Sequence, residues 1–422
     1  MRGILPDVIP YLRLGGREWR WPIAVRALSY RNYRLFWFGQ LISLIGTWMQ
    51  GTALQWLVYR LTGSSFRLGL LTFASFLPVL VLSPIAGVLV DRVDRRRLVA
   101  ACQTAFLLQA AVLAGLTFSG IIQYWQIVAL AFLLGIANAF EMPARRAFVV
   151  ELVGREDLMN AIALNSSVFN GARIVGPALA GIIVASVGEA AAFGLNSASY
   201  LAVILGLLAM RLRPPARAMT DRHPVEQLAE GLRYVAGHET IRSLIFMVAV
   251  LSFFGMPYIP LIPVFAGNVL GGGAEVLGLL LSAMGAGALA AALSLALLGG
   301  FRRKGWLVTA ATLILAVSVA TFALSRWLPL SMLALAGAGW AQITQLATTN
   351  TLLQTHVDDA LRGRVMGTFT WMLGGMFPLG ALLLGYLAQR WNAPGAVFCS
   401  ALVCGAFALA GAWRLPQVRR LE

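Results

Sequence analysis

An arginine stands in the middle of a long apolar run. Arg173 lies within residues 159–187, and at about 100° per residue Ser166, Asn170 and Arg173 fall within about 40° of one another on a helix. Placing arginine in hydrocarbon costs about 2.5–3.5 kcal/mol even on lenient insertion scales, so such a residue must face protein or water. We expect this polar stripe to serve substrate binding or ion coupling. A structural ion pair is the alternative.

Glu141 is a carboxylate inside another apolar run, residues 122–144, and Arg145 follows it by four positions. Residues at this spacing lie on one helix face, where the two can pair. Two other roles compete with this local ion pair, because Glu141 can also partner Arg95 in a latch between helices or carry a proton. A proton carrier needs burial, and a position about one turn from the end of the run disfavours burial. We therefore favour the latch.

Amides and hydroxyls mark two further apolar runs. Thr47 and Gln50 lie in residues 35–59, whereas Gln342, Gln345 and Thr349 lie in residues 329–353, within about 60° on one helix face. If these side chains face one central cavity, they predict a mostly apolar binding site with few hydrogen-bonding groups. Such a site suits an amphipathic ligand. The predicted substrate-binding and coupling residues are Thr47, Gln50, Asn170, Arg173, Gln342 and Gln345.

The apolar runs that contain these residues are expected to lie in a lipid bilayer. Of 422 residues, 59% are hydrophobic and 12% are charged, which leaves too few polar groups to cover a soluble surface. A spanning helix needs about 20 apolar residues, so the sequence predicts an all-α membrane protein with about twelve transmembrane helices. The apolar runs are residues 35–59, 66–90, 97–119, 122–144, 159–187, 190–211, 242–269, 274–299, 305–325, 329–353, 363–389 and 394–414.

The basic residues indicate how these helices are oriented. A net charge of +16 would suggest nucleic acid in a soluble protein, but the arginines are dispersed at the ends of apolar runs. We therefore expect no nucleic-acid partner. Placing the N-terminus inside puts Arg92, Arg145, residues 212–241 and Arg362 in the cytoplasm, as the positive-inside rule requires. An even number of spans returns the C-terminus to the same side, so both termini are predicted to be cytoplasmic.

The chain divides into two six-helix halves. Residues 151–160 and 354–363 are similar to each other, each follows a fourth run, and each fifth run carries proline with glycine. Parallel halves of this kind place a substrate site near the midplane between them. The predicted divisions are a basic cytoplasmic segment at 1–33, halves at 34–212 and 241–415, a cytoplasmic linker with an amphipathic helix at 213–240, and a cytoplasmic tail at 416–422.

Signals for an enzyme or a metal site are weak. The histidines all lie in or beside predicted loops, and the cysteines make an odd total within apolar runs, so neither a disulfide framework nor a metal cluster is indicated. These residues are His223, His238, His356, Cys102, Cys399 and Cys404. We expect no catalytic residue, no metal and no cofactor, and the protein is not predicted to be an enzyme.

The loop between the second and third runs carries a recognisable pattern. Gly87 is followed four residues later by Asp91 and then by Arg92 and Arg95, which resembles the signature loop of the major facilitator superfamily. The family usually has glycine where this chain has Asp94. The resemblance implies a gate in which Gly87 permits close helix approach. The predicted gating residues are Gly87, Asp91, Arg92, Arg95, Glu141 and Arg145.

Further segments narrow the resemblance. Residues 41–50, 56–64, 140–146 and 164–181 look like the drug-and-siderophore exporter branch of that superfamily, which includes macrolide efflux proteins, and the likeness covers residues 30–415. Within it, Gly176, Pro177 and Gly181 resemble the fifth-helix signature of antiporters, where glycine and proline allow tight packing and a bend.

This resemblance implies a function. The expected activity is proton-driven export of a small amphipathic compound, such as a drug, macrolide or siderophore, by halves that rock around a central site. The expected partners are a small-molecule substrate, protons and the lipid bilayer. The resemblance also implies a monomer in a bacterial plasma membrane.

Two other functions stay open. Related sequences of the same fold include a lysolipid transporter, so transport of a lipid or lysolipid is one of them. A cavity between the halves that opens sideways to the bilayer would favour this function. A non-transporting membrane sensor or scaffold is the alternative from a different class. That alternative leaves Arg173 and the glutamine stripe without a purpose, so we favour transport.

Overall fold

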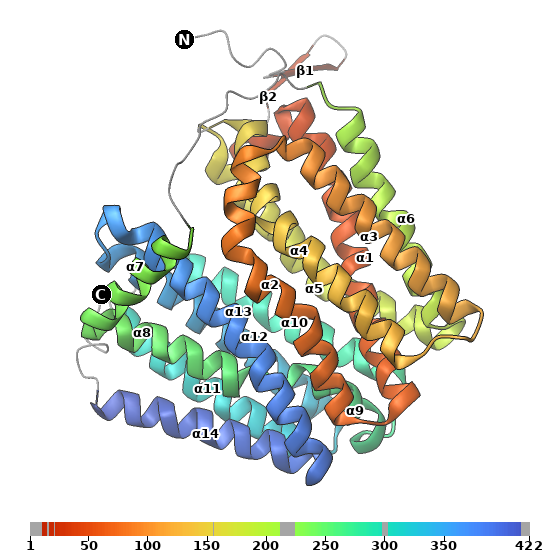
Figure 1. Ribbon diagram of the computed structural model, residues 1–422, viewed down its shortest axis with the longest axis vertical. Helices are drawn as coiled ribbons and strands as arrows, with labels where there is room; N and C mark the ends of the chain where they lie inside the picture. Colours follow the sequence, from red (N-terminus) through yellow and green to blue (C-terminus); the bar gives the residue numbers. More distant parts are fainter. Residues whose placement is uncertain are drawn as a thin grey trace.

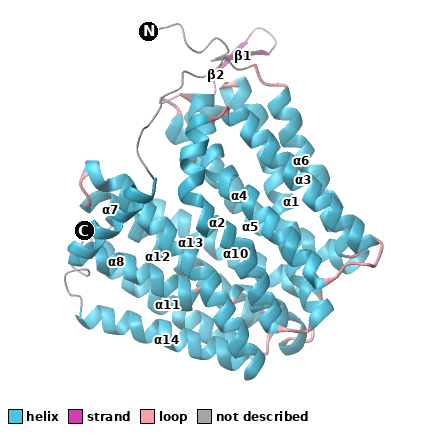
Figure 2. Cartoon of the chain, in the orientation of Figure 1, coloured by secondary structure: helices cyan, strands magenta, loops and turns pink. Residues whose placement is uncertain are grey.

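Long helices dominate the computed structural model, which describes residues 11–14, 17–20, 22–154, 156–211, 224–297 and 303–414 (Figure 1, Figure 2). A linker helix, α7 (Pro224–Gly237), separates two groups of helices. The first group is α1 (Arg31–Thr62), α2 (Ser65–Arg92), α3 (Arg95–Phe118), α4 (Tyr124–Val153), α5 (Leu158–Val187) and α6 (Glu189–Leu208). The second group includes α8 (Glu239–Val250), α10 (Ala274–Leu297), α11 (Lys304–Leu324), α12 (Leu328–His356), α13 (Asp359–Arg390) and α14 (Ala393–Arg414).

Prolines break the helix that follows α8. Proline removes a helical hydrogen bond and clashes with the preceding turn, and Pro257, Pro260 and Pro263 lie close together here. The chain passes through short turns: η2 (Leu251–Gly255, a π-helix), η3 (Ile259–Leu261, a 3-10 helix), α9 (Ile262–Val264) and η4 (Phe265–Val269, a π-helix). Glu239–Val269 is nevertheless one apolar segment long enough to cross a membrane.

Ten helical segments in the described ranges are long and apolar enough to cross a membrane. Helices α1 and α12 are not among them, although they contain 32 and 29 residues. Helix α12 carries polar side chains along its length, including Gln342, Gln345 and Thr349. A helical membrane fold is therefore confirmed. The twelve spans, the cytoplasmic termini and the predicted divisions of the chain stay predictions.

The N-terminal segment contains structure that the all-α expectation did not include. Strands β1 (Tyr11–Leu14) and β2 (Arg17–Arg20) pair antiparallel, and the 3-10 helix η1 (Ile23–Ser29) leads into α1. The backbone N–H of Ala27 donates to the side-chain oxygen of Asn160 in α5 at 2.8 Å. Helix η1 is therefore anchored to the first group of helices.

The two groups of helices meet through two related contacts. The second helix of each group packs on the fifth helix of the other, so α2 contacts α13 and α10 contacts α5. A Cβ on Gly69 would lie 2.4 Å from the Ala381 carbonyl oxygen, and one on Gly181 would lie 3.0 Å from the Ala274 carbonyl oxygen. Glycine therefore lets both helix pairs approach closely.

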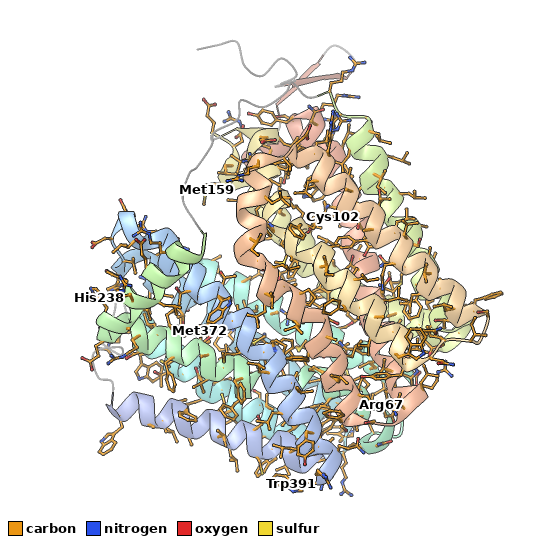
Figure 3. All side chains as sticks on the ribbon, viewed as in Figure 1. Arg67, Cys102, Met159, His238, Met372 and Trp391 are labelled. Atoms are coloured by element: carbon orange, nitrogen blue, oxygen red, sulfur yellow. The ribbon has the colours of Figure 1, made fainter. Side chains whose placement is uncertain are left out.

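These close contacts lie where α2 begins and α13 ends, and where α5 ends and α10 begins. Arg67, labelled in Figure 3, marks this end of α2. From there the two groups diverge toward the opposite ends of α2 and α13 (Figure 1). The molecule is thus closed at one end of the interface between its helix groups.

Gly69 and Gly87 of α2 form a matched pair for testing this contact. A Cβ on Gly87 would meet no atom within 4 Å, so the expectation that Gly87 permits close helix approach is wrong for this structure. Gly69→Ala should destabilise the protein by about 1–3 kcal/mol, because the backbone of α13 must shift to admit the methyl group. Gly87→Ala should not lower stability and should raise it by up to about 1 kcal/mol, because alanine favours a helix more than glycine does. Thermal unfolding of both variants in one detergent measures the difference, and equal midpoints would contradict the tight α2–α13 contact.

Helix α7 corresponds to the amphipathic helix expected within residues 213–240, of which 213–223 lie outside the described ranges. Its Glu230 carboxylate lies 2.9 Å from the Arg364 guanidinium in α13. A Cβ on Gly231 would lie 2.7 Å from the Arg364 carbonyl oxygen. The helix is therefore packed on the second group.

Candidate functional site

A cavity of about 340 Å³ lies between the first group of helices and the segments η3 and α10 of the second. This volume suits a drug-sized molecule. Both groups contribute to its wall, which is mainly apolar and includes aromatic side chains. The polar and charged residues in the wall are Gln40, Ser43, Thr47, Thr52, Gln55, Gln103, Asn138, Glu141, Arg145 and Arg173.

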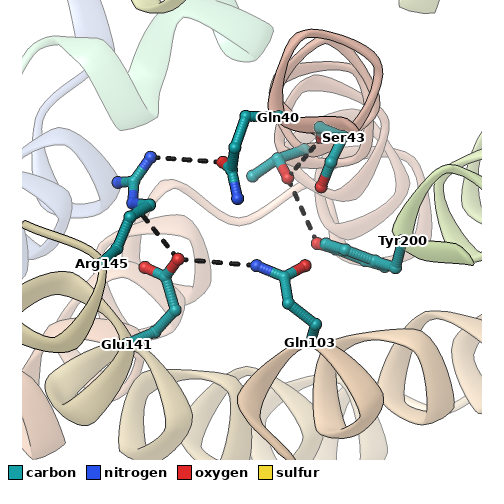
Figure 4. A network of polar contacts seen from close by, with 7 residues as sticks. Gln40, Ser43, Gln103, Glu141, Arg145 and Tyr200 are labelled. Atoms are coloured by element: carbon teal, nitrogen blue, oxygen red, sulfur yellow. Dashed lines mark hydrogen bonds and ion pairs between the residues drawn. The ribbon is translucent and has the colours of Figure 1, made fainter. Parts of the chain in front are cut away.

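Glu141 occupies the centre of a polar network in this wall (Figure 4). Its side chain is buried, with 4% of the residue exposed. Its Oε1 lies 3.2 Å from Nε of Arg145 and accepts from the Gln103 amide at 3.5 Å. Arg145 also donates to the Gln40 side-chain oxygen of α1 at 3.4 Å. The network therefore joins α1, α3 and α4, and it balances the Glu141 charge locally.

The predicted latch between Arg95 and Glu141 is wrong for this structure. Arg95 at the start of α3 pairs with Glu151, whose Oε1 lies 2.5 Å from Nη1. Glu141 lies about 15 Å further along α4 than Glu151, because each helical residue advances about 1.5 Å. Glu141 instead takes the local pairing with Arg145 that its spacing allowed. Arg95 of α3 therefore still forms an ion pair with α4, but its partner is Glu151 in place of Glu141.

The signature loop has a local structural role at Asp94. The Asp94 side chain caps α3 by accepting from the backbone N–H of Arg97 at 3.1 Å. An aspartate at this position satisfies a free helical N–H, which accounts for its presence where the family usually has glycine. Arg92 is exposed at the end of α2, and the Asp91 side chain lies outside the described part of the chain.

Arg173 lies midway along α5 and reaches the cavity wall. The residue is 7% exposed, and its guanidinium carbon lies 5.8 Å from the centre of the Trp48 ring. Gly176 makes this contact possible, since a Cβ there would lie 2.5 Å from Cβ of Trp48. The next residue, Pro177, also lines the cavity. The fifth-helix signature thus brings α1 against α5 beside the arginine.

A buried amide network supports α1 from behind the cavity. The Gln50 amide donates to the Gln109 side-chain oxygen at 3.0 Å, and the Asn196 amide donates to the Gln50 side-chain oxygen at 2.7 Å. Thr47 lines the cavity, and its hydroxyl lies 3.2 Å from the Tyr200 hydroxyl. Gln50 does not line the cavity. It fixes α1 against α3 and α6.

The structure assembles the predicted central residues only in part. Thr47 and Arg173 line the cavity, whereas Asn170 is half-buried outside the cavity wall and donates to the Ser166 carbonyl oxygen of its own helix at 2.9 Å. Gln342 and Gln345 are buried in α12 outside the cavity wall, because α12 packs against α10 and α11. Their roles in transport stay predictions.

Sequence reasoning missed five polar residues of these networks. Gln40, Gln103 and Tyr200 line the cavity, and Gln109 and Asn196 lie behind it. A signal was present, because each is a hydrogen-bonding side chain inside an apolar run and must find a partner there.

Paired groups of long helices with a cavity between them define the fold of a membrane transporter. Solved structures confirm the fold. A bacterial homologue of the human lysosomal transporter Spinster, in an inward-facing and unoccupied conformation, matches with a TM-score of 0.74 at 14% identity, over 92% of this chain and 98% of that one. The nucleoside transporter NupG matches with a TM-score of 0.74 at 12% identity, over 90% and 98% of the two chains.

The family follows from the sequence match. The model of the transmembrane secretion effector family matches residues 24–422, and this chain belongs to that family of major facilitator transporters. It is therefore a transporter and not an enzyme.

Bacterial relatives with curated names match most of the chain. The enterobactin exporter EntS of Shigella boydii is 27% identical over 85% of this chain and 86% of that protein. The multidrug efflux pump Tap of Mycolicibacterium fortuitum is 28% identical over 84% and 88%. The staphyloferrin A transporter of Staphylococcus aureus is 25% identical over 84% and 89%.

Proposed function

We propose that this chain is a secondary active exporter of small amphipathic compounds in a bacterial plasma membrane. The observation that carries this proposal is the cavity between the two helix groups, with Glu141 and Arg145 paired in its wall. The groups are in close contact where α2 begins and α13 ends. The arginine-rich loops at the other ends are expected to be cytoplasmic. A compound would enter from the cytoplasm and leave after the groups rock about the cavity.

The relatives support this substrate class. Their names describe enterobactin export, multidrug efflux and staphyloferrin A transport, which involve compounds of different structure. A mainly apolar wall with a few hydrogen-bonding groups accommodates such variety better than a densely polar site does.

We further propose protons as the coupling ion and Glu141 as their carrier. Among the described residues of the cavity wall, Glu141 is the carboxylate. Its partner Arg145 also contacts Gln40 on α1. Movement of α1 relative to α4 would therefore change the ion pairing of Glu141, and the stability of a carboxylate's charged form depends on such pairing. This arrangement would link proton uptake to conformation.

Transport in proteoliposomes tests the proposal. Two fluorescent dyes with the same xanthene framework serve as probes: fluorescein, an anion, and rhodamine 123, a cation. An imposed pH gradient should drive at least one dye across the membrane against its concentration gradient, and a protonophore should stop this movement. Dye transport that is unchanged by the protonophore would contradict proton coupling. Movement of neither dye would count against export of amphipathic compounds.

A further inference from the structure

Arg173 presents a positive charge to the cavity without a carboxylate partner among the described residues. The residue is more than nine-tenths buried, and its Nε is buried without a hydrogen-bond partner there. The carboxylate of the cavity wall, Glu141, is already paired with Arg145. The described wall therefore contains two arginines and one carboxylate, which leaves one positive charge uncompensated.

The contact with Trp48 does not satisfy this arginine. A ring face 5.8 Å from the guanidinium carbon attracts the charge but accepts none of its N–H groups in the manner of an oxygen. Buried charged groups in proteins are normally paired and hydrogen-bonded, because a low-dielectric surrounding makes an unpaired one costly. The structure thus holds a donor group that lacks its acceptor.

Aromatic side chains share the cavity wall with the arginine. The Trp48 and Phe169 rings pack edge to face with their centres 5.6 Å apart, and both line the cavity. Phe106 adds a further apolar surface to the wall. A ligand that satisfies all of these groups carries an oxyanion on an aromatic or otherwise apolar body, since the guanidinium fork matches a carboxylate or sulfonate in geometry and charge.

We propose that the substrates of this transporter are amphipathic anions and that Arg173 binds their anionic group. This inference rests on the proposed export function and specifies its substrate class. Trp48 and Phe169 hold the apolar body beside the arginine. The glycine at position 176 keeps Trp48 in place by allowing α1 and α5 to touch.

Binding and export of the two xanthene dyes test this proposal. Wild-type protein should bind and export fluorescein in preference to rhodamine 123. Arg173→Gln should weaken fluorescein binding at least tenfold and rhodamine 123 binding much less, so that the preference reverses. Arg173→Lys keeps the charge without the planar fork and should fall between them. Arg326→Gln removes a positive charge from an exposed position outside the cavity and serves as the control. Fluorescence anisotropy of each dye on purified protein measures affinity, and proteoliposomes measure export.

Each outcome bears on one of the two proposals. Export of rhodamine 123 but not fluorescein by the wild type would overturn the anion assignment and leave the export function standing. An equal loss of both dyes in a correctly folded Arg173→Gln variant would also overturn it, because the arginine would then be structural. Export of neither dye would count against the proposed function itself.

Discussion

A cross-link between Ser64 and Gln389 is expected to reduce export to the level of protein-free liposomes. Ser64 follows α1, and its hydroxyl donates to the Gln389 side-chain oxygen of α13 at 2.9 Å. This bond crosses between the helix groups at the end where they are closed. Alternating access requires that end to open once in every cycle. A covalent bridge there would hold the molecule in the conformation described here.

The experiment uses Ser64→Cys with Gln389→Cys and a short bis-methanethiosulfonate reagent. Cys399 is exposed and should be replaced by serine, whereas Cys102 and Cys404 are buried and can remain. Export of the dyes by reconstituted protein should stop after the reagent is added. It should return when dithiothreitol cleaves the bridge.

A second bridge at the same end provides the matched control. Arg67 of α2 and Tyr124 of α4 belong to one helix group, and the Tyr124 hydroxyl donates to the Arg67 carbonyl oxygen at 2.9 Å. Cross-linking Arg67→Cys to Tyr124→Cys should leave export intact, because it joins helices that move together. Export that survives the Ser64–Gln389 bridge would show that this end need not open.

The helices could be predicted from the sequence because lipid imposes a simple pattern on them. The run at 66–90 corresponds to α2 (Ser65–Arg92), and the run at 190–211 corresponds to α6 (Glu189–Leu208). The π-helical and 3-10 turns after α8 were less accessible, because Pro257, Pro260 and Pro263 indicate a break without fixing its geometry. The strands of the N-terminal hairpin contain four residues each, which is too short an alternation to distinguish a strand from a loop.

The site could be predicted only in part because composition does not specify how a helix is rotated. Arg173 was identifiable since arginine is costly in an apolar run. Gln345 and Gln103 gave the same kind of signal, yet α12 turns Gln345 away from the cavity and α3 turns Gln103 into it. The expectation that Glu141 lies too near the end of its run to be buried is wrong for a different reason. Helix α4 continues beyond the apolar run to Val153, so Glu141 lies further from the helix end than expected and is buried.

Glu141→Gln should abolish uphill export in a pH gradient while leaving insertion and folding intact. Glutamine preserves the shape of the side chain and can still accept from Arg145 and Gln103, but it cannot exchange a proton at neutral pH. Without a titrating group, substrate movement would no longer be tied to proton movement. The variant should therefore let dye equilibrate down its own gradient and lose the response to a protonophore.

Glu189→Gln is the matched control for Glu141→Gln. It shows whether a loss of proton coupling is specific to Glu141 or follows from removing any buried carboxylate. Glu189 is 6% exposed and its carboxylate lies 2.7 Å from the Arg60 guanidinium, but it does not line the cavity. Removing its charge should change the unfolding midpoint little, because its partner Arg60 has a half-exposed side chain and stays solvated, and gradient-driven export should continue. Dye accumulation with and without an imposed pH gradient, measured for both variants in the same liposomes, provides the comparison. Uphill export that persists in Glu141→Gln would assign Glu141 to local pairing with Arg145 and place proton coupling on another residue.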